Sequence, residues 1–381
     1  MLRFLTAGES HGRALLVIVE GLPAGLPITV EDISSELARR RLGYGRGPRM
    51  RFEQDAVTLV SGVLHGSTIG SPVGIEIANT EWPKWEEQMS PAPGGGGRRL
   101  TQPRPGHADL AGMQKYGFDD VSSVLERASA RETAARVAAG ACAKALLRQL
   151  GTEVLSHVVQ LGPVASKGTR RPMPGDLEQV DASPVRCFDP DAEAAMVAEI
   201  KAAMRDGDSL GGVVEVLAYG VPVGLGSHVH WDRKIDGRLA GALMSIQAVK
   251  AVEIGDGIDV AGRRGSEAHD AITWDGGYHR ESGRAGGIEG GITTGELVSA
   301  RVYMKPLATL ARPTLATVDV DTKEPTVSFK ERTDATAVPA MGVVAETMTS
   351  LVLANEALRK FGGDSMDEIV RNRDGFLDDL S

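Results

Sequence analysis

The stretch MLRFLTAGESHGRALLVIVE, residues 1–20, places two apolar runs on either side of a short polar turn. Residues 1–5 and 14–20 have the composition of strands, and the small residues between them predict a hairpin. Gly8 and Gly12 leave the backbone of the turn open to close approach. The turn also carries His11, and histidine is the side chain best suited to give and take a proton at cellular pH. The stretch alone leaves open a turn in which His11 only caps backbone groups.

Length and composition narrow the class of protein around this hairpin. A chain of 381 residues can bury a large core, as one elaborate domain or as two. Its 47 glycines follow no three-residue period and predict many tight turns, and only 4% of the residues are aromatic, so the core should be aliphatic. The formal charge of −9 argues against a general binder of nucleic acid or anionic membranes. An anionic ligand must therefore be held by a local cluster of cations.

Cysteine content and hydropathy indicate a soluble cytoplasmic protein. Cys142 and Cys187 are too few for a disulfide scaffold or a cysteine-based zinc site. His228 and His230 alternate in a loop without a third ligand in view, so no metal site is expected. No apolar run approaches the roughly 20 residues that span a bilayer, and the first residues do not have the pattern of a signal peptide.

A cluster of arginines follows the first predicted helix. Thr29 reads as its N-cap with Asp32 three residues on, and residues 39–51 then hold six arginines, several spaced by glycines. Arginines at the end of a helix complement its dipole, which accounts for part of the cluster. The glycine-spaced arginines are suited to bidentate contacts with phosphate or carboxylate groups. A solvated loop is the alternative.

Two further segments carry chemistry-bearing residues. A glycine-rich stretch, residues 90–105, leads into Arg104 and His107, which form a second Gly-His element with a nearby cation. Downstream, Arg127 and Arg131 flank Ser129 just before the Ala-rich helix predicted over 134–150, where free backbone amides favour an anion. The alternative for this segment is that its arginines pair with Glu126 and Glu132.

The remaining pattern predicts an α+β protein. Strands are expected at 55–64, 72–78, 153–161, 211–218, 296–304 and 314–320, and helices at 190–206, 232–249 and 340–360, the second of these three carrying Gln247 and Ala248. Strand-rich stretches are followed twice by a long small-residue helix, which suggests a pseudo-repeat. We therefore expect two related sheet-plus-helix halves in a single large domain, residues 1–365, followed by a polar tail, residues 366–381.

Taken together, the motifs resemble the chorismate synthase family. The resemblance rests on seven segments in order along residues 1 to about 365. They are GESHG at 8–12, RRLGYGRG at 40–47, RPGHAD at 104–109, ERASARET at 126–133, GGIEGG at 286–291, KP at 305–306, and RTD at 332–334 with AVP at 337–339.

The resemblance implies a fold and an activity. Members of this family have a β-α-β sandwich core, form homotetramers and convert 5-enolpyruvylshikimate 3-phosphate to chorismate and phosphate. The reaction is an anti-1,4-elimination that requires reduced FMN without net redox change, and it is the last step of the shikimate route to aromatic amino acids. Such an enzyme is a carbon–oxygen lyase acting on phosphates.

The resemblance also implies site residues. His11 would protonate the leaving phosphate, His107 would balance the proton inventory of the flavin, and Asp334 would help to deprotonate its N5. FMN contacts transfer to Arg127, Ala128, Ser129, Gln247, Ala248, Gly290, Lys305, Pro306, Leu307, Ala308, Thr309 and Arg332. Contacts with the substrate or NADP fall on Ser10, Arg40, Arg46, Arg49, Arg104 and Arg131.

Two questions of function stay open at this stage. Some family members reduce their own flavin with NADPH, but this chain shows no extra module, so an external flavin reductase is expected as a partner. Competing functions are a polyanion binder that uses the arginines of 39–51 for RNA and an ordinary flavin oxidoreductase. Low aromatic content and net negative charge count against RNA binding.

Overall fold

The computed structural model describes residues 1–47, 52–94, 99–329 and 333–380. Its first element is the hairpin expected from the opening stretch. β1 (Arg3–Ala7) and β2 (Ala14–Glu20) pair antiparallel. β6 (Val73–Ala78) and β3 (Val57–Ser61) extend them into a four-stranded antiparallel sheet in the order β1-β2-β6-β3.

This sheet has one buried face and one outer face. In β2 alternate side chains are buried against the helices: Leu15, Val17 and Val19. Leu16 and Ile18 point outward and are about half exposed. Alternation of this kind is expected for an antiparallel sheet that covers the core on one side only.

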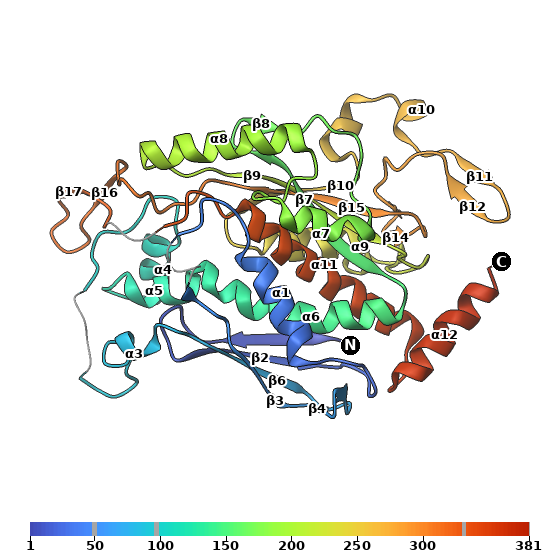
Figure 1. Ribbon diagram of the computed structural model, residues 1–381, viewed down its shortest axis with the longest axis horizontal. Helices are drawn as coiled ribbons and strands as arrows, with labels where there is room; N and C mark the ends of the chain where they lie inside the picture. The colour runs from blue at the N-terminus through green and yellow to red at the C-terminus, as the bar shows by residue number, and fades with distance from the viewer. Residues whose placement is uncertain (48–51, 95–98, 330–332, 381) are drawn as a thin grey trace.

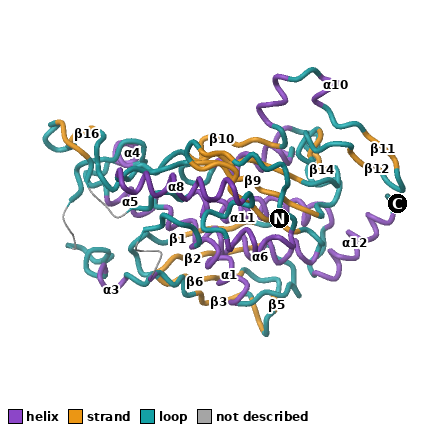
Figure 2. The backbone as a smooth tube through the Cα atoms, turned by 45° about the horizontal axis from the view of Figure 1, so that its top comes forward, coloured by secondary structure: helices purple, strands orange, loops and turns teal. Residues whose placement is uncertain are grey.

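A layer of helices separates this sheet from a second one (Figures 1 and 2). α6 (Thr133–Gln149) packs on β2, while α11 (Val338–Phe361) packs on β7 and β9 of the second sheet and also directly on α6. α1 (Val30–Arg41) and α9 (Ile235–Met244) lie beside them. The predicted β-α-β sandwich with two sheet-plus-helix halves is thereby confirmed.

The second sheet has five antiparallel strands in the order β10-β15-β9-β7-β8. Their bounds are β7 (Glu153–Leu161), β8 (Val164–Ala165), β9 (Gly212–Tyr219), β10 (Val249–Ile254) and β15 (Val298–Met304). The strands predicted at 153–161, 211–218 and 296–304 agree with these bounds to within two residues.

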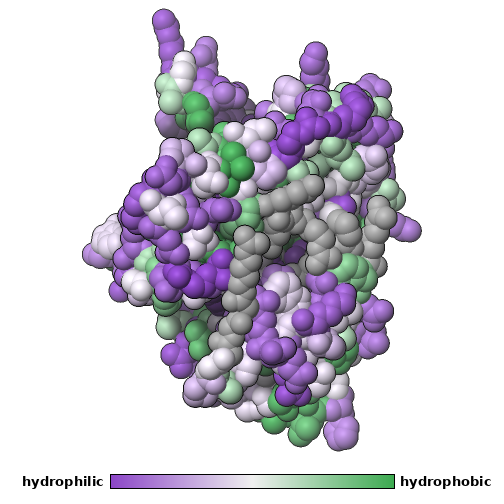
Figure 3. All heavy atoms as spheres, turned by 90° about the vertical axis from the view of Figure 1, so that its left-hand side faces the viewer, coloured by the Kyte–Doolittle hydropathy of each residue, from purple (hydrophilic) through white to green (hydrophobic). Residues whose placement is uncertain are grey.

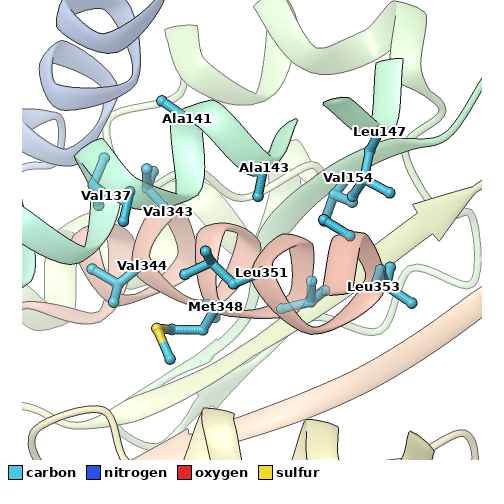
Figure 4. Close-up of a cluster of buried hydrophobic side chains, with 14 of the residues drawn as sticks. Val137, Ala141, Ala143, Leu147, Val154, Val343, Val344, Met348, Leu351 and Leu353 are labelled. Carbon is cyan, nitrogen blue, oxygen red and sulfur yellow. The ribbon is translucent and has the colours of Figure 1, made fainter. Parts of the chain in front are cut away.

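Small and aliphatic side chains fill the space between the two long helices. Figure 4 shows Ala143 of α6 pointing towards α11, where Leu351 lies, whereas Ala141 points to the opposite side of α6. Alanines dominate the inner side of α6, and they allow the helix backbones to approach closely. The core is aliphatic, as the low aromatic content predicts.

Further helices and several short hairpins surround the sandwich. Helices are α3 (Trp82–Trp85), α4 (Asp109–Tyr116), α5 (Ser122–Ala128), α7 (Leu177–Ala182), α8 (Pro190–Asp206), α10 (Gly265–Ala268) and α12 (Met366–Asp378). Short hairpins are β4–β5 (Val63–Leu64, Ser67–Thr68), β11–β12 (Ile272–Trp274, Tyr278–Arg280), β13–β14 (Ile288–Glu289, Ile292–Thr293) and β16–β17 (Ala316–Val318, Pro325–Val327). The segment expected as a polar tail forms α12, which begins at a capping box of Ser365 and Glu368.

One predicted helix is too long. The helix expected over 232–249 ends at Met244, so Gln247 and Ala248 lie in the turn that enters β10. Ala248 has a φ of 66°, which no helix accommodates, and Val249 already pairs with Met304 across the sheet. Strand pairing therefore overrides the helical periodicity of this segment.

Among the described residues, one helix has the length and composition of a membrane span. This helix is α11, and 89% of its most apolar 18-residue window is buried inside the protein. Its apolar character is that of a central core helix.

Candidate active site

A cavity of about 550 Å³ draws its lining from both halves of the fold. One side comes from the turn after β1 and the loop after α1, and the other from the turn before β10, the loop after β15 and the start of α11. Among the described residues, its charged and imidazole side chains are four arginines, two histidines and one aspartate: Arg40, Arg46, Arg104, Arg131, His11, His107 and Asp334. The lining therefore carries an excess of positive charge.

His11 is held on two sides. Its Nδ1 lies 2.7 Å from Glu126 Oε1, and its backbone N–H donates to Glu126 Oε2 at 2.8 Å. Its ring stacks on the indole of Trp85, with ring centroids 4.0 Å apart and planes inclined by 24°. Because Nδ1 faces the carboxylate, Nε2 is the ring nitrogen left for a ligand, and it has no hydrogen-bond partner among the described residues.

His107 has a similar arrangement built from its own loop. Its Nδ1 bonds to Asp109 Oδ1, and the same carboxylate accepts from Arg104 Nε at 2.8 Å. Burial of Asp109 works against ionisation, but the hydrogen bonds from His107 and Arg104 hold the pKa of this carboxyl well below its usual range. Arg104 also donates to Thr309 Oγ1 at 3.0 Å, which ties this loop to the segment after β15.

Two buried arginines share one carboxylate beside the cavity. Arg131 pairs with Asp55 and donates to Asn79 Oδ1 at 2.9 Å, while Arg40 reaches the other oxygen of Asp55 at 3.5 Å. Burial lowers the pKa of Arg40 to about 10, with Asp55 acting against this shift and Arg131 adding to it. Arg40 Nε has no hydrogen-bond partner among the described residues. Buried positive charge that is only partly compensated favours an anionic ligand.

The three arginines at the end of α1, Arg39, Arg40 and Arg41, point in different directions. Arg40 points to the cavity, but Arg39 pairs with Glu346 in the core and Arg41 donates to the carbonyl of Glu53. Consecutive helical residues point about 100° apart, so three adjacent arginines cannot serve one site. Arg39 and Arg41, which were not among the predicted site residues, therefore make contacts within the fold, and Arg40 is the one of the three that lines the cavity.

Arg46 and Asp334 join the loop after α1 to the segment before α11. Arg46 Nε lies 3.1 Å from Asp334 Oδ2, and the N–H of Gly47 donates to Asp334 Oδ1 at 2.5 Å. A Cβ on Gly47 would lie 2.9 Å from that same carboxylate oxygen, so only glycine fits here without a shift. Arg46 Nη1 is buried without a hydrogen-bond partner among the described residues.

Gln247 presents a carbonyl oxygen beside the cavity. Its Nε2 donates to Glu132 Oε2 at 3.0 Å, so its Oε1 points away from Glu132, and this oxygen is buried without a partner among the described residues. Ser129 Oγ donates to Ser10 Oγ at 3.1 Å and links the segment before α6 to the opening turn. The turn therefore meets the start of α6 at the cavity wall.

The predicted site residues fall into three groups. Thirteen line the cavity: Ser10, His11, Arg40, Arg46, Arg104, His107, Ser129, Arg131, Gln247, Leu307, Ala308, Thr309 and Asp334. Six lie outside this lining: Arg127, Ala128, Ala248, Gly290, Lys305 and Pro306. Arg49 and Arg332 lie outside the described residues.

Residues outside the lining still brace it. Arg127 donates to the carbonyls of Thr6 and Gly8 and so holds the opening turn, while Lys305 donates to the carbonyl of Gly106 beside His107. The alternative in which arginines pair with Glu126 and Glu132 holds only for Arg127 and Glu132, at 3.9 Å, because Glu126 binds His11.

Three residues of the site were not among the sequence predictions: Trp85, Glu126 and Asp109. Asp109 carries a local signal, since a carboxylate two residues after a histidine can reach its ring. Trp85 and Glu126 lie 74 and 115 positions from His11, and no local pattern connects them to it.

The end of the molecule formed by α3, α4, α5 and the β16–β17 hairpin is dominated by hydrophilic residues (Figure 3). α3 supplies Trp85 and the loop before α4 supplies His107, so this polar end contributes directly to the cavity wall. Within the described ranges, no group of three histidine, cysteine, aspartate or glutamate side chains could hold a metal ion.

Comparisons with known proteins agree on one family. The family model described as chorismate synthase matches residues 2–358. Proteins named chorismate synthase from Salinispora tropica and Thermobifida fusca are 61% and 59% identical, with alignments covering all of this chain and 99% of each relative. A crystal structure titled as that of chorismate synthase has a TM-score of 0.81 at 40% identity and covers all of this chain and 98% of its own.

Proposed function

The chain belongs to the chorismate synthase family, and from that premise we propose that it converts 5-enolpyruvylshikimate 3-phosphate to chorismate and phosphate by 1,4-elimination, the last step of the shikimate route. The observation that carries the proposal is the cavity lined by four arginines and two carboxylate-paired histidines. A substrate with one phosphate and two carboxylates needs cations that bind it and a proton donor for its leaving group. In an acidic chain these groups converge at one place.

The lining also fits reduced FMN. The cavity offers a buried acceptor in Gln247 Oε1 and buried guanidinium N–H donors in Arg40 and Arg46, all without partners among the described residues. The ring N–H donors of a flavin match the acceptor Gln247 Oε1, and the guanidinium donors remain for the anions of the substrate. Ser129, Gln247 and the segment Leu307–Thr309 would hold the cofactor. When bound, reduced FMN supplies electron density to the substrate and takes up the C6 proton.

His11 is the residue we assign to the leaving group. Loss of phosphate places negative charge on the bridging oxygen, and a proton on His11 Nε2 would neutralise it as it forms. Arg40 and Arg46 would hold the substrate anions and exclude alternative orientations. Both arginines are buried, so their charge is little screened by water.

His107 and Asp334 would serve the proton balance on the other side of the cavity. His107 Nδ1 is hydrogen-bonded to Asp109, so His107 would gain or lose its exchangeable proton at Nε2. Asp334 is anchored by Arg46 and Gly47, which orients its carboxylate at the cavity wall. Both assignments rest on the matching family motifs together with this geometry.

Assembly, location and flavin reduction complete the proposal. A homotetramer is supported by family membership and by the outer face of the four-stranded sheet, where Leu5, Leu16 and Ile18 are exposed. We place the enzyme in the cytoplasm because the family acts in biosynthesis. An external flavin reductase would supply reduced FMN, and NADPH would be the ultimate reductant, with Arg40 and Arg46 as nicotinamide-nucleotide contacts.

The decisive experiment mixes the protein anaerobically with reduced FMN and 5-enolpyruvylshikimate 3-phosphate and follows the absorbance of chorismate. Product that appears only when protein, substrate and reduced flavin are all present supports the proposal, and absence of product would overturn it. An ordinary flavin oxidoreductase would instead consume NADPH without any shikimate compound. An RNA binder would show affinity that falls steeply with salt.

A further inference from the structure

Glu126 is an unusual neighbour for His11 because it binds two groups of the same residue. One carboxylate oxygen lies 2.7 Å from Nδ1 and the other accepts the backbone N–H at 2.8 Å. Among the described residues, no other group forms a hydrogen bond or ion pair with either oxygen of this carboxylate. The carbonyl of Glu126 also accepts the N–H of Ser10 at 3.0 Å, so backbone and side chain grip the turn together.

The two histidines of the cavity differ in this respect. Asp109 divides its oxygens between His107 and Arg104, and it also caps the N–H of Arg104 at 3.0 Å, so its loss would disturb the whole loop. Within the described part of the chain, the carboxylate of Glu126 hydrogen-bonds to His11 alone. Its side chain is about 10% exposed, so an ionised carboxylate there destabilises the fold unless it is paired, and its partner is the imidazole of His11.

We propose that Glu126 is a positioning residue that keeps a proton on Nδ1 of His11 and so makes Nε2 the nitrogen that loses and regains a proton. This inference rests on the proposed elimination reaction. Because a carboxylate only accepts, it keeps a proton on Nδ1 whether the ring is charged or neutral. The proton that is lost and regained must then be the one on Nε2, which is left for the substrate. Trp85 closes the remaining side, since its stacked indole opposes tilting of the ring.

Replacement of Glu126 by glutamine tests the acceptor requirement with little change in size. Glutamine can accept only one of the two N–H groups, because its other terminal atom is a donor. If it accepts the backbone N–H of His11, its NH₂ donates to Nδ1, and the neutral ring then keeps its proton on Nε2. The tautomer of His11 therefore reverses although the ring stays in place.

The experiment compares wild type with Glu126→Gln and with the matched control Glu87→Gln, an exposed carboxylate beyond α3. We expect kcat to fall about 100-fold in Glu126→Gln, with KM for the enolpyruvyl substrate changed less than about threefold. Glu87→Gln should keep wild-type kinetics. An unchanged kcat in Glu126→Gln, or a loss confined to KM, would overturn the proposal.

A spectroscopic readout separates positioning from a merely structural role. Histidine-selective ¹⁵N labelling reports the tautomer of each neutral imidazole, and the signals missing from His11→Ala identify His11 among the eight histidines. We expect the Nδ1–H form in wild type and the Nε2–H form in Glu126→Gln. A wild-type His11 in the Nε2–H form refutes the inference, even if Glu126→Gln fails to fold.

The same measurements distinguish this inference from the function on which it rests. A wild-type protein that makes no chorismate removes the proposed reaction, whereas the NMR spectra still report whether Glu126 sets the tautomer. Normal turnover in both wild type and Glu126→Gln leaves the proposed reaction intact and removes only the role of Glu126.

Discussion

Gly140 of α6 lies so close to Thr347 of α11 that a Cβ on Gly140 would stand 2.2 Å from the Thr347 Cβ. The two helices that join the halves of the sandwich therefore approach at a point where only hydrogen fits. Gly140→Ala should lower the free energy of unfolding by about 1–3 kcal/mol, because the helices must move apart. Chemical denaturation measures the loss.

The matched control is Gly241→Ala on α9, where a Cβ would meet no atom within 4 Å. This change should stabilise the protein by about 0.5–1 kcal/mol, since alanine is the better helix former. Equal effects of the two substitutions would show that the contact with Thr347 is not what requires glycine.

Glu346 is the fully buried centre of an ionic network in the helix layer. It accepts hydrogen bonds from Arg39 at 2.7 Å, Lys144 at 2.7 Å and Arg186 at 3.0 Å. Burial opposes its ionisation, but these three cations hold the pKa of Glu346 well below its usual range. Glu346→Gln should cost about 3–5 kcal/mol in denaturant unfolding because it leaves buried positive charge without compensation. The exposed control Glu324→Gln should change little, and a similarly small effect at Glu346 would contradict this account.

His11→Ala tests the assigned proton donor directly. Turnover should fall by about 10²–10⁴-fold, the range expected for loss of a general acid. FMN binding, followed by the change in flavin fluorescence, should remain within a few-fold of wild type because the expected FMN contacts are other residues. Full activity would remove His11 from the mechanism.

Arg46→Lys tests recognition of the substrate anions. Lysine keeps the charge but loses the planar set of donors, including Nη1, which is buried without a partner in the described part of the chain. KM for the enolpyruvyl substrate should rise about 10–100-fold in steady-state assays. Arg3→Lys, in an exposed pair with Glu20, serves as the control and should leave KM unchanged.

The lowered pKa of Glu215 leads us to expect a loss of stability against unfolding at low pH. Burial raises the pKa of this carboxyl, but hydrogen bonds from His157 and Arg171 outweigh burial and bring it to about 2, against an ordinary value of 4.5. A lowered folded-state pKa means that the stabilisation is complete above pH 4.5 and is lost as the pH falls towards 2. The difference corresponds to about 3 kcal/mol.

Denaturant unfolding at several pH values measures this contribution. Wild type should lose more stability than Glu215→Gln between pH 4.5 and the lower limit at which the protein stays folded. Parallel pH dependence in the two proteins would mean that Glu215 contributes nothing to the acid response.

Local sequence patterns predicted much of the framework. The opening hairpin, the Thr29–Asp32 capping box and the bounds of β7 and α8 follow from contacts within a few residues, and the structure confirms them. The helix expected to include Gln247 was wrong, because the pairing of Val249 with Met304 ends it early. Helical periodicity is a local pattern, so it carries no information about a strand 55 residues away that pairs with the same segment.

The sequence by itself determined most of the elements, the local cluster of arginines in an acidic chain and the motifs that carry the family resemblance. Only the tertiary structure decided which partner each of those groups has. Arg40 reaches the cavity while Arg39 enters the core, and His11 meets Glu126 across 115 positions. Periodicity specifies which face of an element is buried, but the partner on that face depends on how distant elements pack. The opening turn became a catalytic candidate with defined proton chemistry only when the helix before α6 placed a carboxylate on its imidazole.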